Sequence, residues 1–327
     1  MKVKKEYILL VLIILALSIY LYLRSPDRTL YQVPEVPDVV GEDITEIEIT
    51  RPGGVTISLK KKDDRWFIKP QGFLADTAKV QGMVDHMKEI TLTALVSEAK
   101  DYNRYELGDD QKITVKARIG DKLTRNFDVG KVAPSYRHTF VKLADDAKVY
   151  HARGNFRSNF DQTVEGLRDK KVLSFDKKEI SKIRISKAQK ELLLERKEVP
   201  VEADSSQEAD KEKKPDVKKE TVWVNPEGKK GDKSKVSSLL KTLSGLECKR
   251  YIGDRKRDDF KDPIYTVRLK GHQEYTLSIF AKKDKDSKNY PAVSSQNDYP
   301  FELADYQANK IMIDPEEMLK NPEQSKN

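Results

Sequence analysis

The residue types that most often carry chemistry are few in this chain and lie far apart. The histidines are His86, His138, His151 and His272; none belongs to an H-E-x-x-H arrangement, and no two lie four positions apart. Zinc sites need several ligands at set spacings, so each histidine is interpreted as a surface or packing residue. The sequence also lacks a Gly-rich phosphate loop and a G-x-S-x-G turn. It therefore predicts no catalytic, cofactor-binding or metal-binding residue.

Other candidates for chemistry are equally unspecific. The single cysteine, Cys248, excludes an internal disulfide and has no paired spacing typical of a metal site. We interpret it as a half-buried packing residue. Acidic residues are abundant and could converge in three dimensions, but nothing in the sequence selects a carboxylate pair.

The pattern of a short amphipathic helix occurs twice in the sequence. Residues 76–90 (DTAKVQGMVDHMKEI) align without a gap with residues 232–246 (DKSKVSSLLKTLSGL), and their apolar positions recur at helical spacing. Asp76 and Asp232 open these segments and are expected to be helix N-caps. Each apolar stripe must then lie on a sheet or another helix.

Two further residue types recur at matching places. Trp66 and Trp223 each precede one of the helices, and Lys79 and Lys235 follow the two caps. Repeated aromatic rings could line a groove for a peptide or glycan, but such rings more often pack between sheet and helix. The lysines are interpreted as solvated residues on the polar face.

The strand-like segments also come in the same order in both halves. ITEIEIT at 44–50 begins the first series and ISKIRIS at 180–186 begins the second, each with alternating isoleucines. Turn signals separate the segments that follow. The sequence predicts an α+β fold of two tandem repeated modules, each a mainly antiparallel sheet with an amphipathic helix packed on it.

The N-terminus is basic and then apolar. MKVKKE precedes a charge-free run from Tyr7 to Leu23, which as a helix reaches roughly 25 Å. Its bulky exit, SIYLYLRS, favours an uncleaved transmembrane signal anchor over a cleaved signal peptide. The lysines before it are expected to stay in the cytoplasm. We therefore expect a single-pass protein of the cytoplasmic (inner) membrane, bound to the lipid bilayer through Tyr7 to Leu23, with its body in the periplasm or outside the cell.

Composition sets the remaining boundaries. Residues 1–24 hold the anchor, 25–42 form a Pro-containing spacer, 43–167 the first module and 168–313 the second. Within the second module, residues 198–220 are nearly devoid of apolar side chains and are expected to be a flexible charged insertion at a hairpin tip. The tail, 314–327, is expected to be disordered. Residues 155–167 are expected to close the first module as a helix or helical turn.

These residues resemble a known family. The Ile-alternating strand, the Trp-bearing strand, D-x-x-K-V opening a helix, and VEGLRDKKVLSFDKKEISKIRI at 164–185 are similar to the bacterial domain of unknown function 4340. The resemblance covers about residues 43–313 and implies no catalytic residues. It implies a membrane-anchored, outward-facing protein. Related domains occur in auxiliary components of gliding-motility-type ABC transporters, which implies a class of partner.

The charge pattern disfavours nucleic acid as a partner. Charged residues make up 35% of the 327 residues, but lysines and acids are interleaved and the net charge is only +8. The basic runs at 60–62 (KKK) and 255–257 (RKR) could touch anionic lipid headgroups or an envelope polymer, each charge contributing about 1 kcal/mol near an anionic surface.

Three functions are compatible with this sequence. The leading hypothesis is a membrane-anchored, extracytoplasmic binding or assembly protein without catalytic activity or cofactor, an accessory to an ABC transporter or cell-envelope complex with protein partners. The alternative is a hydrolase of an envelope polymer, with acidic residues in a cleft between the repeats. The third is a spacer that only positions other envelope proteins. A cleft with clustered, perturbed carboxylates favours the hydrolase, whereas a flat apolar patch of roughly several hundred Å² on strand or helix faces favours partner binding. If neither is present, the spacer remains.

Overall fold

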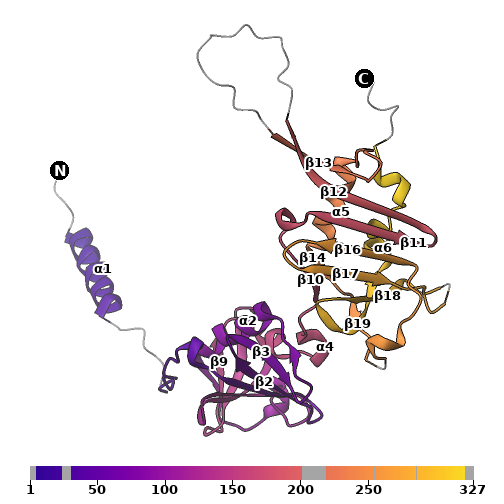
Figure 1. Ribbon diagram of the computed structural model, residues 1–327. Coiled ribbons are helices and arrows are strands. Elements are labelled where there is room, and N and C mark those ends of the chain that lie inside the picture. The colour runs from indigo at the N-terminus through magenta and orange to yellow at the C-terminus, as the bar shows by residue number, and fades with distance from the viewer. Residues whose placement is uncertain (1–4, 24–30, 201–218, 254, 285, 321–327) are drawn as a thin grey trace. The chain divides into compact units, whose positions relative to one another are not determined.

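The computed structural model describes residues 5–23, 31–200, 219–253, 255–284 and 286–320 (Figure 1). The chain divides into two compact units, Met1–Thr163 and Val164–Asn327. Both units consist mostly of antiparallel strands with a few helices, so the α+β prediction is confirmed at this level.

The N-terminal helix α1 covers Lys5–Leu23. Its side chains are described for residues 10–21, where the large apolar ones are between 48% and 66% exposed. Within the described residues, we find no helix with both the length and the apolar character needed to cross a membrane. The transmembrane span expected over Tyr7–Leu23 is therefore not supported.

A nine-stranded antiparallel sheet forms the first unit, in the order β4-β3-β2-β1-β6-β7-β8-β9-β5. Its strands are β1 (Glu46–Thr50), β2 (Thr56–Lys62), β3 (Arg65–Lys69), β4 (Phe73–Leu74), β5 (Leu92–Ser97), β6 (Ile113–Ile119), β7 (Lys122–Val132), β8 (His138–Leu143) and β9 (Val149–Arg153). In β1, Ile47 and Ile49 are fully buried opposite Leu59 and Ile57 of β2. A shift of one residue would turn both isoleucines to the other face, so this alternation fixes the register.

Helix α2 (Thr77–Lys88) buries the stripe that the sequence predicts: Val80, Met83, Val84 and Met87. Each such side chain contributes roughly 1.5–3 kcal/mol when fully buried. The cap is also confirmed, because the Asp76 carboxylate accepts hydrogen bonds from the N–H groups of Ala78 and Lys79 at 3.0 and 3.2 Å. The closing helix expected over 155–167 is instead two short helices, α3 (Arg157–Phe160) and α4 (Val164–Leu167).

Part of the expected spacer packs on the first unit. Residues 31–40 have no regular structure and are followed by the 3-10 helix η1 (Gly41–Asp43). The Val39 N–H donates to the carbonyl oxygen of Lys88 at 3.1 Å, and Arg125 on β7 donates to the carbonyl oxygen of Pro37 at 2.6 Å. The spacer expected over 25–42 is therefore fixed to the unit in its second half. Residues 25–30 lie outside the described residues.

The second unit contains an eight-stranded antiparallel sheet in the order β13-β12-β11-β16-β17-β18-β19-β15. Its strands are β11 (Lys182–Lys187), β12 (Lys190–Pro200), β13 (Lys219–Val224), β15 (Arg250–Tyr251), β16 (Tyr265–Lys270), β17 (Glu274–Ile279), β18 (Asn289–Ser294) and β19 (Asn297–Ala304). A separate two-stranded sheet pairs β10 (Lys171–Ser174) with β14 (Gly245–Glu247). The helices α5 (Lys233–Leu243) and α6 (Asp305–Ile311) complete this unit.

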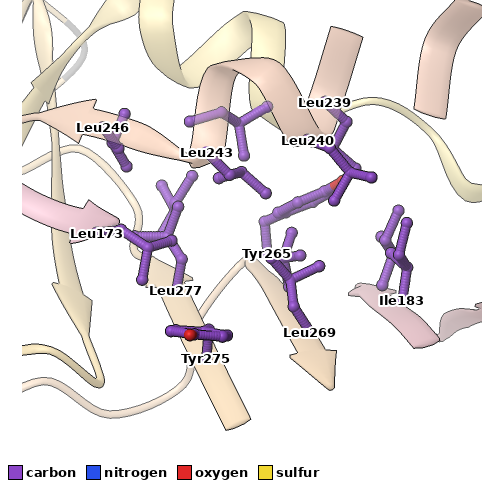
Figure 2. Close-up of a cluster of buried hydrophobic side chains, with 14 of the residues drawn as sticks. Leu173, Ile183, Leu239, Leu240, Leu243, Leu246, Tyr265, Leu269, Tyr275 and Leu277 are labelled. Carbon is purple, nitrogen blue, oxygen red and sulfur yellow. The ribbon is translucent and has the colours of Figure 1, made fainter. Parts of the chain in front are cut away.

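Helix α5 lies on the core of the second unit. Figure 2 shows its leucines, Leu239, Leu240 and Leu243, beside Tyr265 and Leu269 of β16. The Asp232 carboxylate accepts a hydrogen bond from the Lys235 N–H at 3.0 Å, so the second predicted cap is confirmed as well. Local spacing and capping chemistry are therefore sufficient to predict both helices.

The expected flexible insertion is shorter than 198–220. Strands β12 and β13 continue their pairing through Glu198↔Thr221 and Val199↔Glu220 to Pro200↔Lys219. Ladder pairing therefore orders both ends of the segment, and the prediction is wrong there. Residues 201–218 lie outside the described residues.

The tail expected to be disordered over 314–327 is ordered in its first half. The 3-10 helix η5 (Pro315–Met318) places Met318 at 0% exposure in the second core. The carbonyl oxygen of Met318 accepts a hydrogen bond from the Asp232 N–H at 2.8 Å, which links the tail to the start of α5. Burial of one large apolar side chain thus overrides the polar composition of this segment. Residues 321–327 lie outside the described residues.

Candidate functional site

The histidines singled out from the sequence do not gather into a site. The His86 ring lies 5.1 Å from that of Phe156, and the rings of His138 and His151 stack at 5.2 Å. Burial lowers the pKa of His86 and, together with the nearby His138, that of His151. The side chain of His272 is 85% exposed. In the described ranges, no three His, Cys, Asp or Glu side chains form a group that could hold a metal ion.

Cys248 and the tryptophans pack rather than bind. Cys248 is 5% exposed, and burial raises the pKa of its thiol to about 12, which leaves it protonated at neutral pH. It is thus more deeply buried than expected. Trp66 is 6% exposed and Trp223 packs against the second core. The interpretation of all three as packing residues is confirmed.

The two matching lysines differ in their contacts. The Lys79 Nζ atom lies 3.8 Å from a carboxylate oxygen of Asp76. The Lys235 Nζ atom instead donates to the carbonyl oxygen of Glu317 at 2.8 Å. Lys235 therefore holds the η5 segment against α5, a role that its interpretation as a solvated residue missed.

The charged groups at a hollow of about 320 Å³ in the first unit neutralise one another. Lys112 Nζ lies 2.7 Å from Asp109 Oδ1 and 3.6 Å from Asp128 Oδ2, and Lys142 Nζ lies 3.3 Å from Asp128 Oδ2. The hydrogen bond that Lys112 donates to the Asp109 carboxylate is the main cause that raises the pKa of Lys112. These lysines have partners already, so the hollow offers little free charge to a ligand.

A larger cavity in the second unit has a different lining. Its volume is about 540 Å³, within the range of roughly 300–1,000 Å³ typical of ligand pockets. We call it the Arg255 cavity. Its lining residues are Arg250, Tyr251, Ile252, Gly253, Arg255, Asp259, Phe260, Lys261, Asp262, Phe280, Ala281, Lys283, Pro291 and Glu302.

The end of the large sheet positions these side chains. The edge strand β15 supplies Arg250 and Tyr251, and the Ile252 N–H continues the pairing by donating to the carbonyl oxygen of Pro300 at 2.9 Å. A 3-10 helix, η4 (Arg257–Asp259), lies in the loop that follows. Its turn is closed by a hydrogen bond from the Lys256 N–H to the Asp259 carboxylate at 2.8 Å.

Aromatic rings form an apolar wall in the cavity. The rings of Phe260 and Phe280 lie 5.2 Å apart, and Phe280 is 7% exposed. The Arg255 guanidinium carbon lies 3.9 Å from the centre of the Phe260 ring, and its Nη2 donates to the carbonyl oxygen of Asp259 at 2.8 Å. Stacking and this hydrogen bond fix the guanidinium plane and leave further N–H donors unused.

One ion pair in the cavity lining, Arg250 with Glu302, is already fully hydrogen-bonded within the protein. Arg250 binds both carboxylate oxygens of Glu302 at 2.8 Å, and the Asn289 side-chain amide donates to the same carboxylate at 2.7 Å. The hydrogen bond from Arg250 is the main cause that lowers the pKa of Glu302. This pair is therefore a neutral, fixed part of the wall.

Three other cations of the cavity remain uncompensated. Among the residues that the structure describes, Arg255, Lys261 and Lys283 have no carboxylate within ion-pair distance. Asp262 likewise lacks a basic partner there. In the described part of the chain, the lining thus sets these three cations next to apolar rings and beside two carboxylates without a basic partner: that of Asp262, and that of Asp259, which accepts only the backbone N–H of Lys256. A small excess of positive charge remains. Such a surface suits the binding of an anion that is attached to an apolar group.

The same lining offers little for catalysis. It contains no histidine, cysteine, serine or threonine. Glycoside hydrolysis needs one carboxyl group that stays protonated near neutral pH, whereas the pKa of Glu302 is lowered.

Sequence reasoning missed most of this cavity. It singled out Arg255 only as one of three residues in a basic run, and it passed over Phe260, Lys261, Phe280 and Lys283. One sequence pattern could have indicated the cavity. Basic residues lie within a few positions of a phenylalanine in two separate segments outside the strands, RKRDDFK (255–261) and FAKK (280–283).

Comparison with known proteins identifies the family of the chain. No curated protein and no solved structure matches it. The match is to the family described as Domain of unknown function (DUF4340), whose model aligns with residues 66–263. This segment covers more than half of the sequence and includes residues of both units, so the chain belongs to the DUF4340 family.

Proposed function

We propose that this protein is a non-enzymatic binding or assembly protein, held at a membrane by its N-terminal segment, which receives a partner from a transporter or cell-envelope complex. The observation that carries this proposal is the Arg255 cavity, because it combines free cations with an aromatic wall and lacks an acid–base pair. Arginine and aromatic side chains are the types enriched where proteins bind one another.

As part of this proposal, the two units are copies of one module. Corresponding strands follow the order β3-β2-β1-β6-β7-β8-β9 in the first sheet and β13-β12-β11-β16-β17-β18-β19 in the second. The isoleucines that begin each series are all at 0% exposure: Ile44, Ile47, Ile49, Ile180, Ile183 and Ile185. In this proposal, the duplicated module enlarges the surface that one chain offers to proteins of a complex.

Backbone contacts before the capped helices support the same relation. The Ala75 N–H donates to the carbonyl oxygen of Trp66 at 2.8 Å, and the Gly231 N–H donates to that of Trp223 at 2.8 Å. In both units the donor directly precedes the N-cap aspartate of the helix. Coincident amphipathic helices would have no reason to share this contact.

The membrane attachment in the proposal rests on the N-terminal segment. The run from Tyr7 to Leu23 has no charge, and the large apolar side chains of residues 10–21 are exposed. Apolar side chains on all sides of a helix gain free energy when they leave water for lipid or protein. With the basic residues before this run, the body of the protein is proposed to lie outside the cytoplasm.

Crosslinking in native membranes followed by affinity purification and mass spectrometry tests the proposal. We expect the full-length protein to recover subunits of a transporter or envelope complex reproducibly. A variant lacking residues 1–24 should leave the membrane fraction after a carbonate wash and recover fewer of them. A protein that is recovered alone, with or without its N-terminal segment, would count against an assembly function.

A further inference from the structure

We propose that the Arg255 cavity binds an acidic peptide segment of a partner protein, with carboxylates on its cations and an apolar side chain against Phe260 and Phe280. This inference rests on the proposed binding function and names the chemistry of the ligand. Its support comes from three features of the cavity: free charge, the aromatic wall and the carboxylates beside them.

The first feature selects an anion. Arg255, Lys261 and Lys283 have no acidic partner in the described part of the chain, whereas Arg250 is fully engaged by Glu302. A guanidinium held on a phenyl ring presents a preorganised fork that matches the two oxygens of a carboxylate. Because its rotamer is already fixed by stacking, little further conformational entropy is lost on binding.

The second feature selects an anion that carries apolar groups. The rings of Phe260 and Phe280 lie 5.2 Å apart and line the same cavity as the cationic residues. A phosphate-rich polymer or a bare phosphate would cover these rings without apolar contact. An extended peptide with an acidic and an apolar residue two positions apart presents both side chains on the same face, where they can reach the cations and the aromatic wall together.

The third feature is the mixture of charges. The carboxylates of Asp259 and Asp262 line the cavity together with the cations and would repel a densely charged polyanion. A peptide can satisfy them, because its backbone N–H groups are donors. The lining therefore favours a peptide over an anionic polymer or a lipid surface.

Fluorescence anisotropy with a labelled peptide of the repeat Glu-Ser-Leu-Ser, which places glutamate and leucine on the same face when extended, tests this inference on the full-length protein in detergent. The matched probe has glutamine in place of each glutamate. We expect the acidic probe to bind at least tenfold more tightly than the neutral one, and its affinity to fall as salt is raised. Equal binding of the two probes would overturn the inference.

A charge-reversed pair of variants locates the binding. Arg255→Glu should weaken the acidic probe at least tenfold. Arg257→Glu changes the net charge of the same basic run by the same amount but does not line the cavity, so it should change the affinity less than threefold. Equal losses in both variants would show long-range attraction to the run and would refute a built site.

A second pair keeps the test valid if the charge variants are poorly folded. A Cβ added at Gly253, which lines the cavity, would have no atom within 4 Å, so Gly253→Leu should occupy cavity space without strain in the core. Gly245 in β14 is equally unobstructed and lies outside the lining, so Gly245→Leu is the control. Only Gly253→Leu should reduce binding of the acidic probe.

The remaining outcomes separate the inference from the proposed function. Tighter binding of polyphosphate, or of vesicles with an anionic phospholipid, than of the acidic peptide would overturn the peptide assignment. If Arg255→Glu abolishes probe binding but the same partners are still recovered from membranes, the partner does not dock through this cavity. The assembly function would then stand and the inference would fall.

Discussion

At the scale of single residues, the Arg125 side chain makes several backbone hydrogen bonds at once. It is 5% exposed, and its guanidinium donates to the carbonyl oxygens of Met87 and Lys88, at the end of α2, at 2.7 and 3.1 Å. A third bond reaches Pro37 in the segment that leads from α1. A cation at this end of a helix also complements the helix dipole. Arg125 thus joins a strand, a helix terminus and the N-terminal segment.

Replacing Arg125 should therefore loosen two parts of the first unit at once. Arg125→Met removes the side-chain donor from the carbonyl groups of Met87, Pro37 and Thr124, while that of Lys88 keeps the Val39 N–H, and we expect the free energy of unfolding to fall by about 2–3 kcal/mol. Denaturant titration measures this loss, and limited proteolysis should show faster cleavage within residues 31–40. Arg153→Met, at an exposed position at the end of β9, is the control. Unchanged proteolysis in Arg125→Met would show that the segment is held by other contacts.

At the scale of elements, η5 shows how one apolar side chain can order a polar segment. Pro315 begins the turn, the Asp314 carboxylate accepts a hydrogen bond from the Glu316 N–H at 3.2 Å, and Met318 is fully buried. The Lys235 side chain holds the adjacent carbonyl group of Glu317. The element therefore closes the side of the core from which α5 begins.

Truncating this anchor should destabilise the second unit. Met318→Ala is expected to lower the free energy of unfolding by about 2–5 kcal/mol, as for other buried large-to-small substitutions. Glu317→Ala removes an exposed side chain from the same turn and keeps the backbone carbonyl, so it should change stability by less than about 0.5 kcal/mol. Thermal unfolding followed by circular dichroism compares the two. Equal, small effects would mean that η5 contributes little to the core.

The elements also show what a sequence can predict. The helices α2 and α5 were predictable because caps and apolar spacing act within a dozen residues, and β1 and β11 because alternation is local. The η5 turn was not, because the burial of Met318 depends on a helix that begins at Lys233. The Arg255 cavity was missed for the same reason: Arg255 lies in a loop, Phe280 directly follows β17 and Glu302 lies within β19, and only the folded sheet brings the three together. Local patterns predict elements, and long-range packing decides sites.

At the scale of the whole molecule, the chain contains two bodies with separate cores. The core cluster of the second unit includes only residues that follow Val164, from Val172 to Met318. The break at Thr163/Val164 lies just before the boundary of 167/168 expected from the sequence. Because the observed break comes four residues earlier than expected, α4 belongs to the second unit. A contact of this helix with β15 explains why. The Glu165 carboxylate accepts a hydrogen bond from the Tyr251 N–H at 3.2 Å.

This assignment predicts which fragments fold. Fragments 31–163 and 164–320 should each unfold cooperatively on their own, because each closes its own sheet and core. Fragment 168–320 lacks α4, so the Tyr251 N–H loses its acceptor, and Arg168, whose guanidinium carbon lies 3.5 Å from the centre of the Tyr251 ring, loses the nearby Glu165. We expect this fragment to be less stable than 164–320 by about 1–3 kcal/mol.

A variant of fragment 164–320 that carries Glu165→Gln is the control. It should recover only part of the lost stability, because the amide oxygen still accepts a hydrogen bond but carries no charge. Equal stability of 164–320 and 168–320 in denaturant titrations would place the boundary after α4 and assign this helix to the linker between the units.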